Sequence, residues 1–225
     1  GKIKANAVTS AKIKDGTIKI ADLSPFVKAR VLSVQDLEEY VEALQAYVEI
    51  DETTDPTRPT VRVVGANLQI VSGSGATEGE TNGLGNLIVG YDEENQNGDF
   101  GFCDDDQFGN QAACESGGGT WYLSLKNGSH NLVVGRGHSY ASYGGVVIGR
   151  QNIISGVYSS VTGGRNNRAS GIGANISGGL DNNSTGANAA VTGGRFNRAN
   201  GAQSVVSGGE AQIATSPNEW VAPLP

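Results

Sequence analysis

The chain has 225 residues with 34 glycines, no methionine and only 6% aromatic residues, a composition typical of extracellular structural proteins rather than of compact enzyme cores. Its formal net charge of −7 argues against nucleic acid as a partner. No apolar run approaches the roughly 18 residues that cross a bilayer, so we expect no direct membrane span.

Residues 1–25 show a five-residue period. Val8, Ile13, Ile18 and Leu23 recur at this interval, each two residues after a small side chain. The spacing resembles that of pentapeptide-like β-solenoids and predicts a β shaft segment over 1–25.

Residues 26–50 carry apolar side chains at alternating spacings of three and four. These side chains are Val34, Leu37, Val41, Leu44 and Val48. The pattern predicts a short coiled coil whose seam lies in the core of a homotrimer, although the pattern alone does not choose between two and three strands. An ordinary amphipathic helix packed on a globular core is the alternative. Residues 51–60, rich in Pro and Thr, are predicted to form a linker.

Residues 91–128 interrupt a repetitive region with an acidic, aromatic-rich insertion. An early repeat copy, "LIVGYDE" at 87–93, indicates that 61–90 form a β-layer with the first coils of a roll. The only two cysteines, Cys103 and Cys114, lie inside the insertion. A disulfide between them would close the loop and suits an oxidising extracellular setting. A two-cysteine zinc site is the alternative, but no histidine has finger-like spacing to the pair.

The insertion also contains candidate metal-binding residues and candidate receptor-contact residues. Glu93, Asn95, Asn97 and Asp104 fall at positions 1, 3, 5 and 12 of a calcium-loop pattern, for which a solvated acidic loop is the alternative. No other cofactor is expected. The aromatic residues Phe100, Phe102, Phe108, Trp121 and Tyr122 either pack the loop or form a contact for a cell-surface receptor, glycan or matrix protein.

Residues 129–216 repeat every fifteen residues. The register extends back through "VVIGRQN" at 146–152 and, one residue short, through "LVVGRGH" at 132–138. Each unit carries a β-branched residue, a glycine pair and an asparagine, which predict a short strand, a glycine corner and an asparagine ladder in the coils of a β-solenoid. The β-branched column is Val161, Ile176, Val191 and Val206, and the asparagine column is Asn152, Asn167, Asn182 and Asn197.

Such coils contain little apolar material. Ordering fifteen residues costs on the order of 15 kcal/mol in backbone entropy, whereas one buried Val or Ile returns roughly 2 kcal/mol. We therefore expect Val161, Ile176, Val191 and Val206 to face other chains, in a core shared by a homotrimer.

Arginines recur beside the glycine corner. Arg136, Arg150, Arg165 and Arg195 occupy one column, and Arg168 and Arg198 lie on alternate coils. Because stacked like charges repel, each arginine needs an acidic neighbour, an interchain partner or a bound anion. A track for an anionic glycan is one interpretation, with Arg165, Arg168, Arg195 and Arg198 as its candidate residues.

The pattern "SSVTGGRNNRASGIGANISGG" at 159–179 resembles the YadA-like (Hep/Hag) head repeats of trimeric autotransporter adhesins and, more distantly, trimeric tail-fibre-like proteins. The resemblance covers 131–216 and, loosely, 61–91. It implies a parallel β-roll, three chains packed about an axis, and adhesion at a bacterial cell surface. Residues 217–225 would then form a C-terminal cap or tail.

The sequence contains no nucleophile elbow, phosphate loop or zinc-protease motif. The expected protein is therefore a mainly β, non-enzymatic, homotrimeric fibrous adhesin, extracellular or at the cell surface. The receptor-binding tip of a phage or contractile-injection tail fibre is one alternative, and a ligand-free filament or surface-layer subunit is another.

Overall fold

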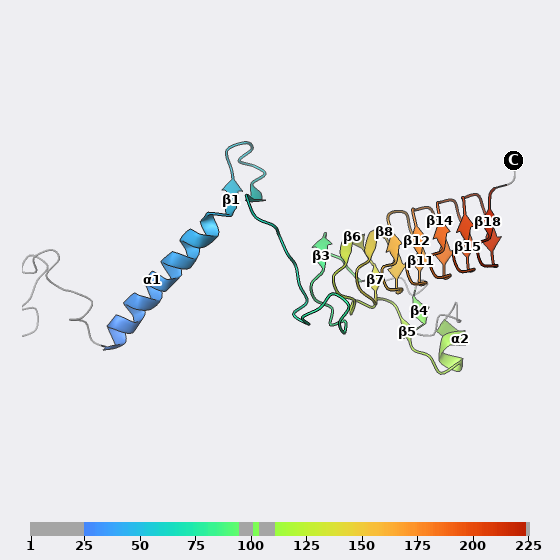
Figure 1. Cartoon of the computed structure of the whole chain (residues 1–225), viewed down its shortest axis with the longest axis horizontal. Coiled ribbons are helices and arrows are strands. Elements are labelled where there is room, and N and C mark those ends of the chain that lie inside the picture. The colour runs from blue at the N-terminus through green and yellow to red at the C-terminus, as the bar shows by residue number, and fades with distance from the viewer. Residues whose placement is uncertain (1–24, 95–100, 104–110, 224–225) are drawn as a thin grey trace, which may run out of the picture. The chain divides into compact units, whose positions relative to one another are not determined.

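The computed structural model describes residues 25–94, 101–103 and 111–223, and the chain divides into two compact units, 1–69 and 70–225 (Figure 1). Residues 1–24 of the predicted β shaft lie outside the described residues. Within the described residues, no helix combines the length and apolar character needed to cross a membrane.

The first unit contains a helix and a hairpin. Helix α1 spans Pro25–Gln45, and strands β1 (Val48–Asp51) and β2 (Thr60–Val63) pair antiparallel. The helix therefore ends five residues before the predicted boundary, and the placement of Val48 in a helical seam is wrong. The β-branched residues of β1 and β2 face one another across the hairpin, and this pairing overrides the helical pattern.

The predicted linker at 51–60 is the turn of this hairpin: Asp51 and Thr60 pair as the last residues of the two strands, and 52–59 form the loop between them. The Asp51 carboxylate accepts hydrogen bonds from the backbone N–H groups of Thr53 and Thr54, at 3.0 and 3.2 Å. An acidic side chain that closes its own turn in this way orders a segment whose composition alone is typical of a linker.

The second unit is a β-roll made of two parallel sheets (Figure 1). The larger sheet, in the order β18-β16-β14-β12-β10-β8-β6-β3, comprises Trp220–Val221, Val205–Val206, Ala190–Val191, Asn175–Ile176, Ser160–Val161, Val146–Arg150, Leu132–Arg136 and Leu87–Val89. The smaller sheet, in the order β17-β15-β13-β11-β9-β7, comprises Ile213–Ala214, Arg198–Ala199, Asn183–Ser184, Arg168–Ala169, Ile153–Ile154 and Ser139–Tyr140. The predicted tail therefore adds a strand, β18, to the roll.

The coils do not all have the same length. Val146 pairs with Ser160, a shift of 14 residues, whereas Ser160 pairs with Asn175, a shift of 15. The early coils have a single glycine, Gly149, where later coils have a pair, and their strands run unbroken for five residues. The fifteen-residue register consequently fails at the start of β8, where Val147 rather than Val146 lies opposite Val161. It holds from Arg150, which pairs with Arg165.

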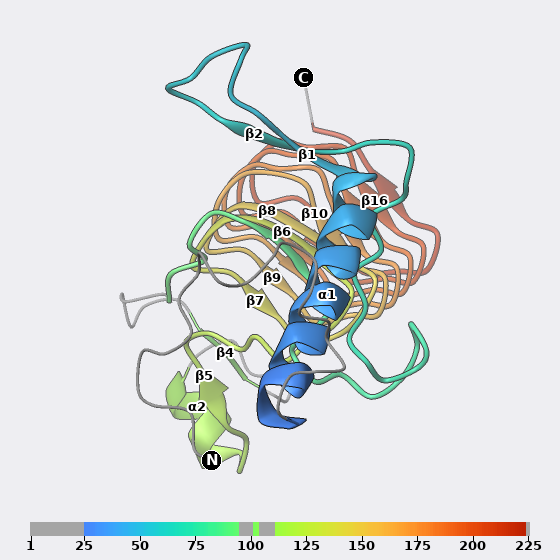
Figure 2. The same cartoon turned by 90° about the vertical axis from the view of Figure 1, so that its left-hand side faces the viewer.

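The core of the roll lies within one chain. Val161, Ile176, Val191 and Val206 are each 0% exposed, so the prediction that they face other chains is wrong. The energy estimate weighed one aliphatic residue per coil and gave the alanines near Ala174 a smaller value, but the second strand of a coil also buries a small residue, such as Ala169 on β11. Backbone hydrogen bonds from each coil to the next add to this burial. Figure 2 shows the coils stacked one behind another.

The asparagine ladder is confirmed. Asn152 Oδ1 accepts a hydrogen bond from the backbone N–H of Asn167 at 2.8 Å, and Asn167 Oδ1 accepts one from Asn182 at 3.0 Å. The side-chain amide nitrogens donate to glycine carbonyls, as Asn182 does to Gly178 and Gly194, both at 3.0 Å. The ladder thus ties side chains to the backbone of the adjacent coil.

His138 takes the ladder position in an early coil and is fully buried. Its Nδ1 accepts a hydrogen bond from the backbone N–H of Asn152 at 3.2 Å, so the proton of the neutral ring sits on Nε2, which lies 3.1 Å from the Val134 carbonyl. Burial lowers the pKa of His138 below its ordinary value of 6.5, although the hydrogen bond to Val134 and the charge of Asp92 oppose this shift.

This burial predicts a loss of stability in mild acid. Below about pH 6.5 the unfolded chain binds a proton at His138 that the folded chain does not, so the unfolding free energy falls by up to about 1.4 kcal/mol per pH unit. Denaturant unfolding at pH 7.5 and pH 5.5 measures this loss. His138→Asn restores the common ladder residue and should flatten the decline. Parallel pH profiles for the two proteins would contradict the assignment.

Candidate binding surface

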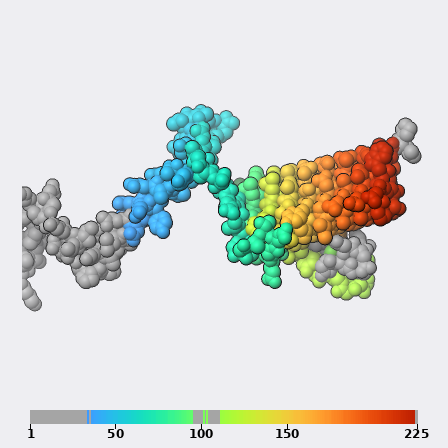
Figure 3. All heavy atoms as spheres, in the orientation of Figure 1, coloured from blue at the N-terminus to red at the C-terminus, as the bar shows by residue number. Residues whose placement is uncertain are grey.

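The outward side chains of the roll form columns at the spacing of parallel strands, about 4.8 Å. Isolated bridges continue the pairing from Arg150 to Arg165, Leu180, Arg195 and Glu210, and Arg136 pairs with Arg150 within β6 and β8. Each coil therefore contributes one residue to this column. In the space-filling view the coils form successive bands along the roll, from yellow to red (Figure 3).

The structure separates the four predicted arginines into two columns. Arg165 and Arg195 lie in the column described above, whereas Arg168 and Arg198 lie on β11 and β15 of the smaller sheet, with Asn183 between them. Arg195 forms an ion pair with Glu210, with Nη2 and Oε2 2.7 Å apart. The pair confirms that an acidic neighbour can relieve the repulsion at that point of the column.

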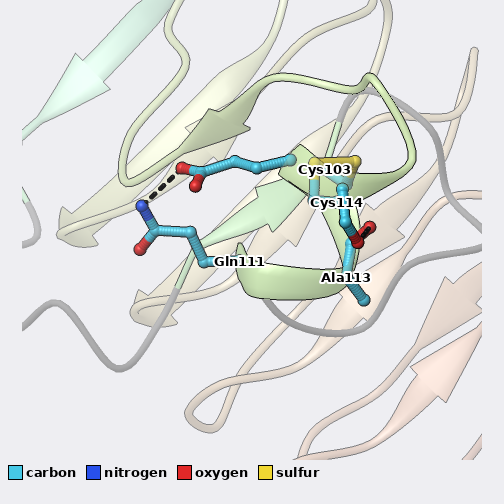
Figure 4. The surroundings of a disulfide bond; sticks show 6 residues. Cys103, Gln111, Ala113 and Cys114 are labelled. Carbon is cyan, nitrogen blue, oxygen red and sulfur yellow. Dashed lines mark hydrogen bonds between the residues drawn. A yellow bond between two sulfur atoms is a disulfide. The ribbon is translucent and has the colours of Figure 1, made fainter.

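The insertion is held by the predicted disulfide. The Cα atoms of Cys103 and Cys114 are 5.6 Å apart, and both residues are fully buried. Cys103 lies on β4 (Phe102–Cys103), which pairs antiparallel with β5 (Trp121–Tyr122), and Cys114 lies on α2 (Gln111–Ser116). Figure 4 shows the bond beside the contact from Gln111 Nε2 to Glu115 Oε1, 2.7 Å long. The disulfide thus joins the short helix to the hairpin.

The predicted aromatic contact is described only in part. Trp121 and Tyr122 are both half-buried. A Cβ atom built on Gly101 would lie 2.4 Å from the Trp121 indole nitrogen, so this ring packs on the backbone of the insertion. Phe100 and Phe108 lie outside the described residues, as does the Phe102 side chain. The described rings therefore contribute to the packing of the insertion.

The base of the insertion is tied to the roll by a buried aspartate. The Asp92 carboxylate lies 3.2 Å from Lys126 Nζ and accepts a hydrogen bond from the Tyr140 hydroxyl, also at 3.2 Å. Burial, with the charge of Asp92, raises the pKa of Tyr140 to about 12, so the hydroxyl remains a donor at neutral pH. These contacts join both ends of the insertion to the coil that contains β7.

The calcium-loop pattern cannot be placed as a site. Glu93 is exposed, whereas Asn95, Asn97 and Asp104 lie outside the described residues. Among the residues that are described, no three His, Cys, Asp or Glu side chains gather closely enough to hold a metal ion.

An apolar surface that we did not predict from the sequence covers one end of the larger sheet. Strands β3, β6 and β8 direct six aliphatic side chains outward, in two columns of three, while Val133 and Val147 between them are fully buried. We call this the outer apolar face, and its residues are Leu87, Val89, Leu132, Val134, Val146 and Ile148. The sequence signal for this face is the continuous apolar runs LVV in β6 and VVI in β8. A run without polar alternation is typical of a strand that is covered on both faces.

Comparisons of the chain with models of known protein families, with curated proteins and with solved structures found no match.

Proposed function

We propose that this chain is a non-enzymatic, homotrimeric, fibrous adhesin of a bacterial surface. The observation that carries the proposal is the presence of an unpartnered apolar surface on each of the two units. On α1 the residues Val34, Leu37, Val41 and Leu44 are 44–61% exposed and still follow coiled-coil spacing. On the roll, Leu87 and Val89 of the outer apolar face are exposed, and the remaining four residues are half-buried.

A second copy of the same chain is the occupant that fits both surfaces. The apolar stripe of α1 can pack against the same stripe on another copy of the chain. The helix ends at Gln45 and β1 begins at Val48, so the seam that α1 supplies is short. The outer apolar face presents two columns of aliphatic side chains on three parallel strands, and burying them against the equivalent strands of further copies would remove them from water. Exposed apolar patches larger than those of typical monomeric proteins mark interaction sites.

The surface role is supported by two further features. The disulfide within the insertion fits an oxidising environment outside the cell. The roll buries its own core and holds its outward columns at fixed spacing, so it presents side chains to a receptor, glycan or matrix protein on a stiff support.

Light scattering on the purified chain should give three times the chain mass of 23.2 kDa. Leu37→Asp with Leu44→Asp should reduce this mass, because charges would enter the apolar seam. Ala43→Asp with Ala46→Asp adds the same two charges away from the stripe and should leave the trimer intact. Leu87→Asp with Val89→Asp tests the roll, with circular dichroism to show that each variant folds.

If the unmodified protein has the mass of a single chain in dilute buffer, the proposed assembly is wrong. The adhesive role is tested by binding of the fluorescently labelled protein to host-type cells and to immobilised matrix proteins. Absence of binding to all of them by an intact trimer would overturn adhesion and leave a structural filament.

A further inference from the structure

We infer that Arg136, Arg150 and Arg165 form a binding track for a linear acidic polysaccharide, which we call the arginine track. The three residues are exposed and lie on three consecutive coils, paired in register from Arg136 to Arg150 and from Arg150 to Arg165. This inference rests on the proposed surface role, and it names the class of ligand for that role.

The track is a concentration of positive charge without internal compensation. None of its three guanidinium groups forms an ion pair within the described part of the chain, whereas Arg195 in the same column is neutralised by Glu210. Leu180 separates the track from that pair. Like charges held about 4.8 Å apart repel one another, so a chain of anions that lies along the column would relieve the repulsion.

The geometry favours an extended ligand with regular anions. Each guanidinium binds a carboxylate or sulfate through two parallel hydrogen bonds, and successive coils present these donors at a constant interval. A linear polysaccharide with uronate or sulfate groups presents its anions at regular intervals along an extended chain. Each exposed pair is weak on its own, so binding requires several pairs in register.

Tyr91 adds an aromatic surface at the head of the track. Gly90 lies close to Gly135 on the next coil, because a Cβ atom built on Gly90 would be 3.2 Å from the Gly135 carbonyl oxygen. Tyr91 follows Gly90 and Arg136 follows Gly135, so Tyr91 continues the column of the track. The Tyr91 side chain is 93% exposed and makes no described contact that would explain an aromatic residue there. An exposed ring offers an apolar face for a sugar and a hydroxyl at its rim.

A nucleic acid is the competing polyanion and fits less well. Its affinity for proteins comes mainly from many phosphate contacts, whereas the track has three arginines in a chain of net charge −7.

The test is binding of the full-length protein to immobilised polygalacturonate and heparin, with dextran and single-stranded DNA for comparison, in 0.1 M salt. The unmodified protein should bind one or both acidic polysaccharides and not dextran. A triple variant, Arg136→Gln with Arg150→Gln and Arg165→Gln, should weaken binding at least tenfold, and Tyr91→Ala about threefold. The matched control, Arg58→Gln with Arg195→Gln and Arg198→Gln, removes the same charge and should change binding less than twofold. These residues lie outside the track, because Arg195 is paired with Glu210 and Arg198 lies on the smaller sheet, which removes both from the ligand site that the sequence predicted.

Three outcomes would overturn the inference: no binding to either acidic polysaccharide, equal weakening by the control, or DNA binding that equals polysaccharide binding and falls with the same variant. Failure here is distinct from failure of the proposed function. If the triple variant remains trimeric and adheres to cells as well as the unmodified protein does, only the arginine track is wrong.

Discussion

Gly186→Ala is expected to destabilise the roll by about 3 kcal/mol, whereas Gly178→Ala in the same coil is expected to be neutral or slightly stabilising. A Cβ atom on Gly186 would lie 2.1 Å from the Gly201 carbonyl oxygen and 2.6 Å from its carbonyl carbon. Both are backbone atoms of the next coil, so the methyl group can be accommodated only if the coils separate. Separation would break the backbone hydrogen bonds from Thr185 and Gly186 to Ala199.

Gly178 provides the matched control because it lies in open surroundings. The nearest heavy atom to its Cβ would be 3.8 Å away, and its backbone does not require the left-handed conformation. Alanine there reduces the freedom of the unfolded chain without a cost in the folded one. Urea unfolding monitored by circular dichroism compares the two variants. Equal midpoints would show that the close approach of the coils is not what makes Gly186 necessary.

The repetitive parts of the fold could be predicted because each position is sampled several times. One Asn or Gly is weak evidence, but Asn152 and Asn167 share a column with two more asparagines, and the structure places all four in one ladder. The disulfide was predictable for a different reason, since only one pairing of two cysteines exists.

The parts that failed depend on contacts that occur once. Val48 pairs with Val63 in a hairpin, so the last predicted turn of the helix does not form. This pairing occurs once and leaves no repeated pattern in the sequence. The burial of Val161 within one chain was missed because the entropy estimate left out small residues such as Ala169. The arginines were found as columns, but the alignment of Tyr91 with them depends on pairing between β3 and β6, across the insertion.

The second large effect is expected at the asparagine ladder, where Asn182→Leu should destabilise the roll by roughly 2–6 kcal/mol. The Asn182 side chain is buried and serves three backbone groups. It accepts from the Asn197 N–H at 2.9 Å and donates to the carbonyls of Gly178 and Gly194. Leucine has a similar volume but satisfies none of them. The Gly194 carbonyl still accepts from the Leu180 N–H at 2.9 Å, so two groups, the Asn197 N–H and the Gly178 carbonyl, lose the hydrogen bond described here. Each buried polar group left without a partner costs about 1–3 kcal/mol.

Asn175→Leu is the matched control, because Asn175 faces outward from β12 and its amide donates only to the Ser160 hydroxyl, at 3.0 Å. The same substitution there should cost less than about 1 kcal/mol. Each coil contacts only its neighbours, so loss of the ladder at Asn182 should also divide the roll. In the Asn182→Leu variant, hydrogen exchange should then be faster at the backbone amides of position 182 and of Asn197 than at those in coils further away. A uniform change along the roll, or equal destabilisation by the two substitutions, would mean that the ladder does not hold adjacent coils together.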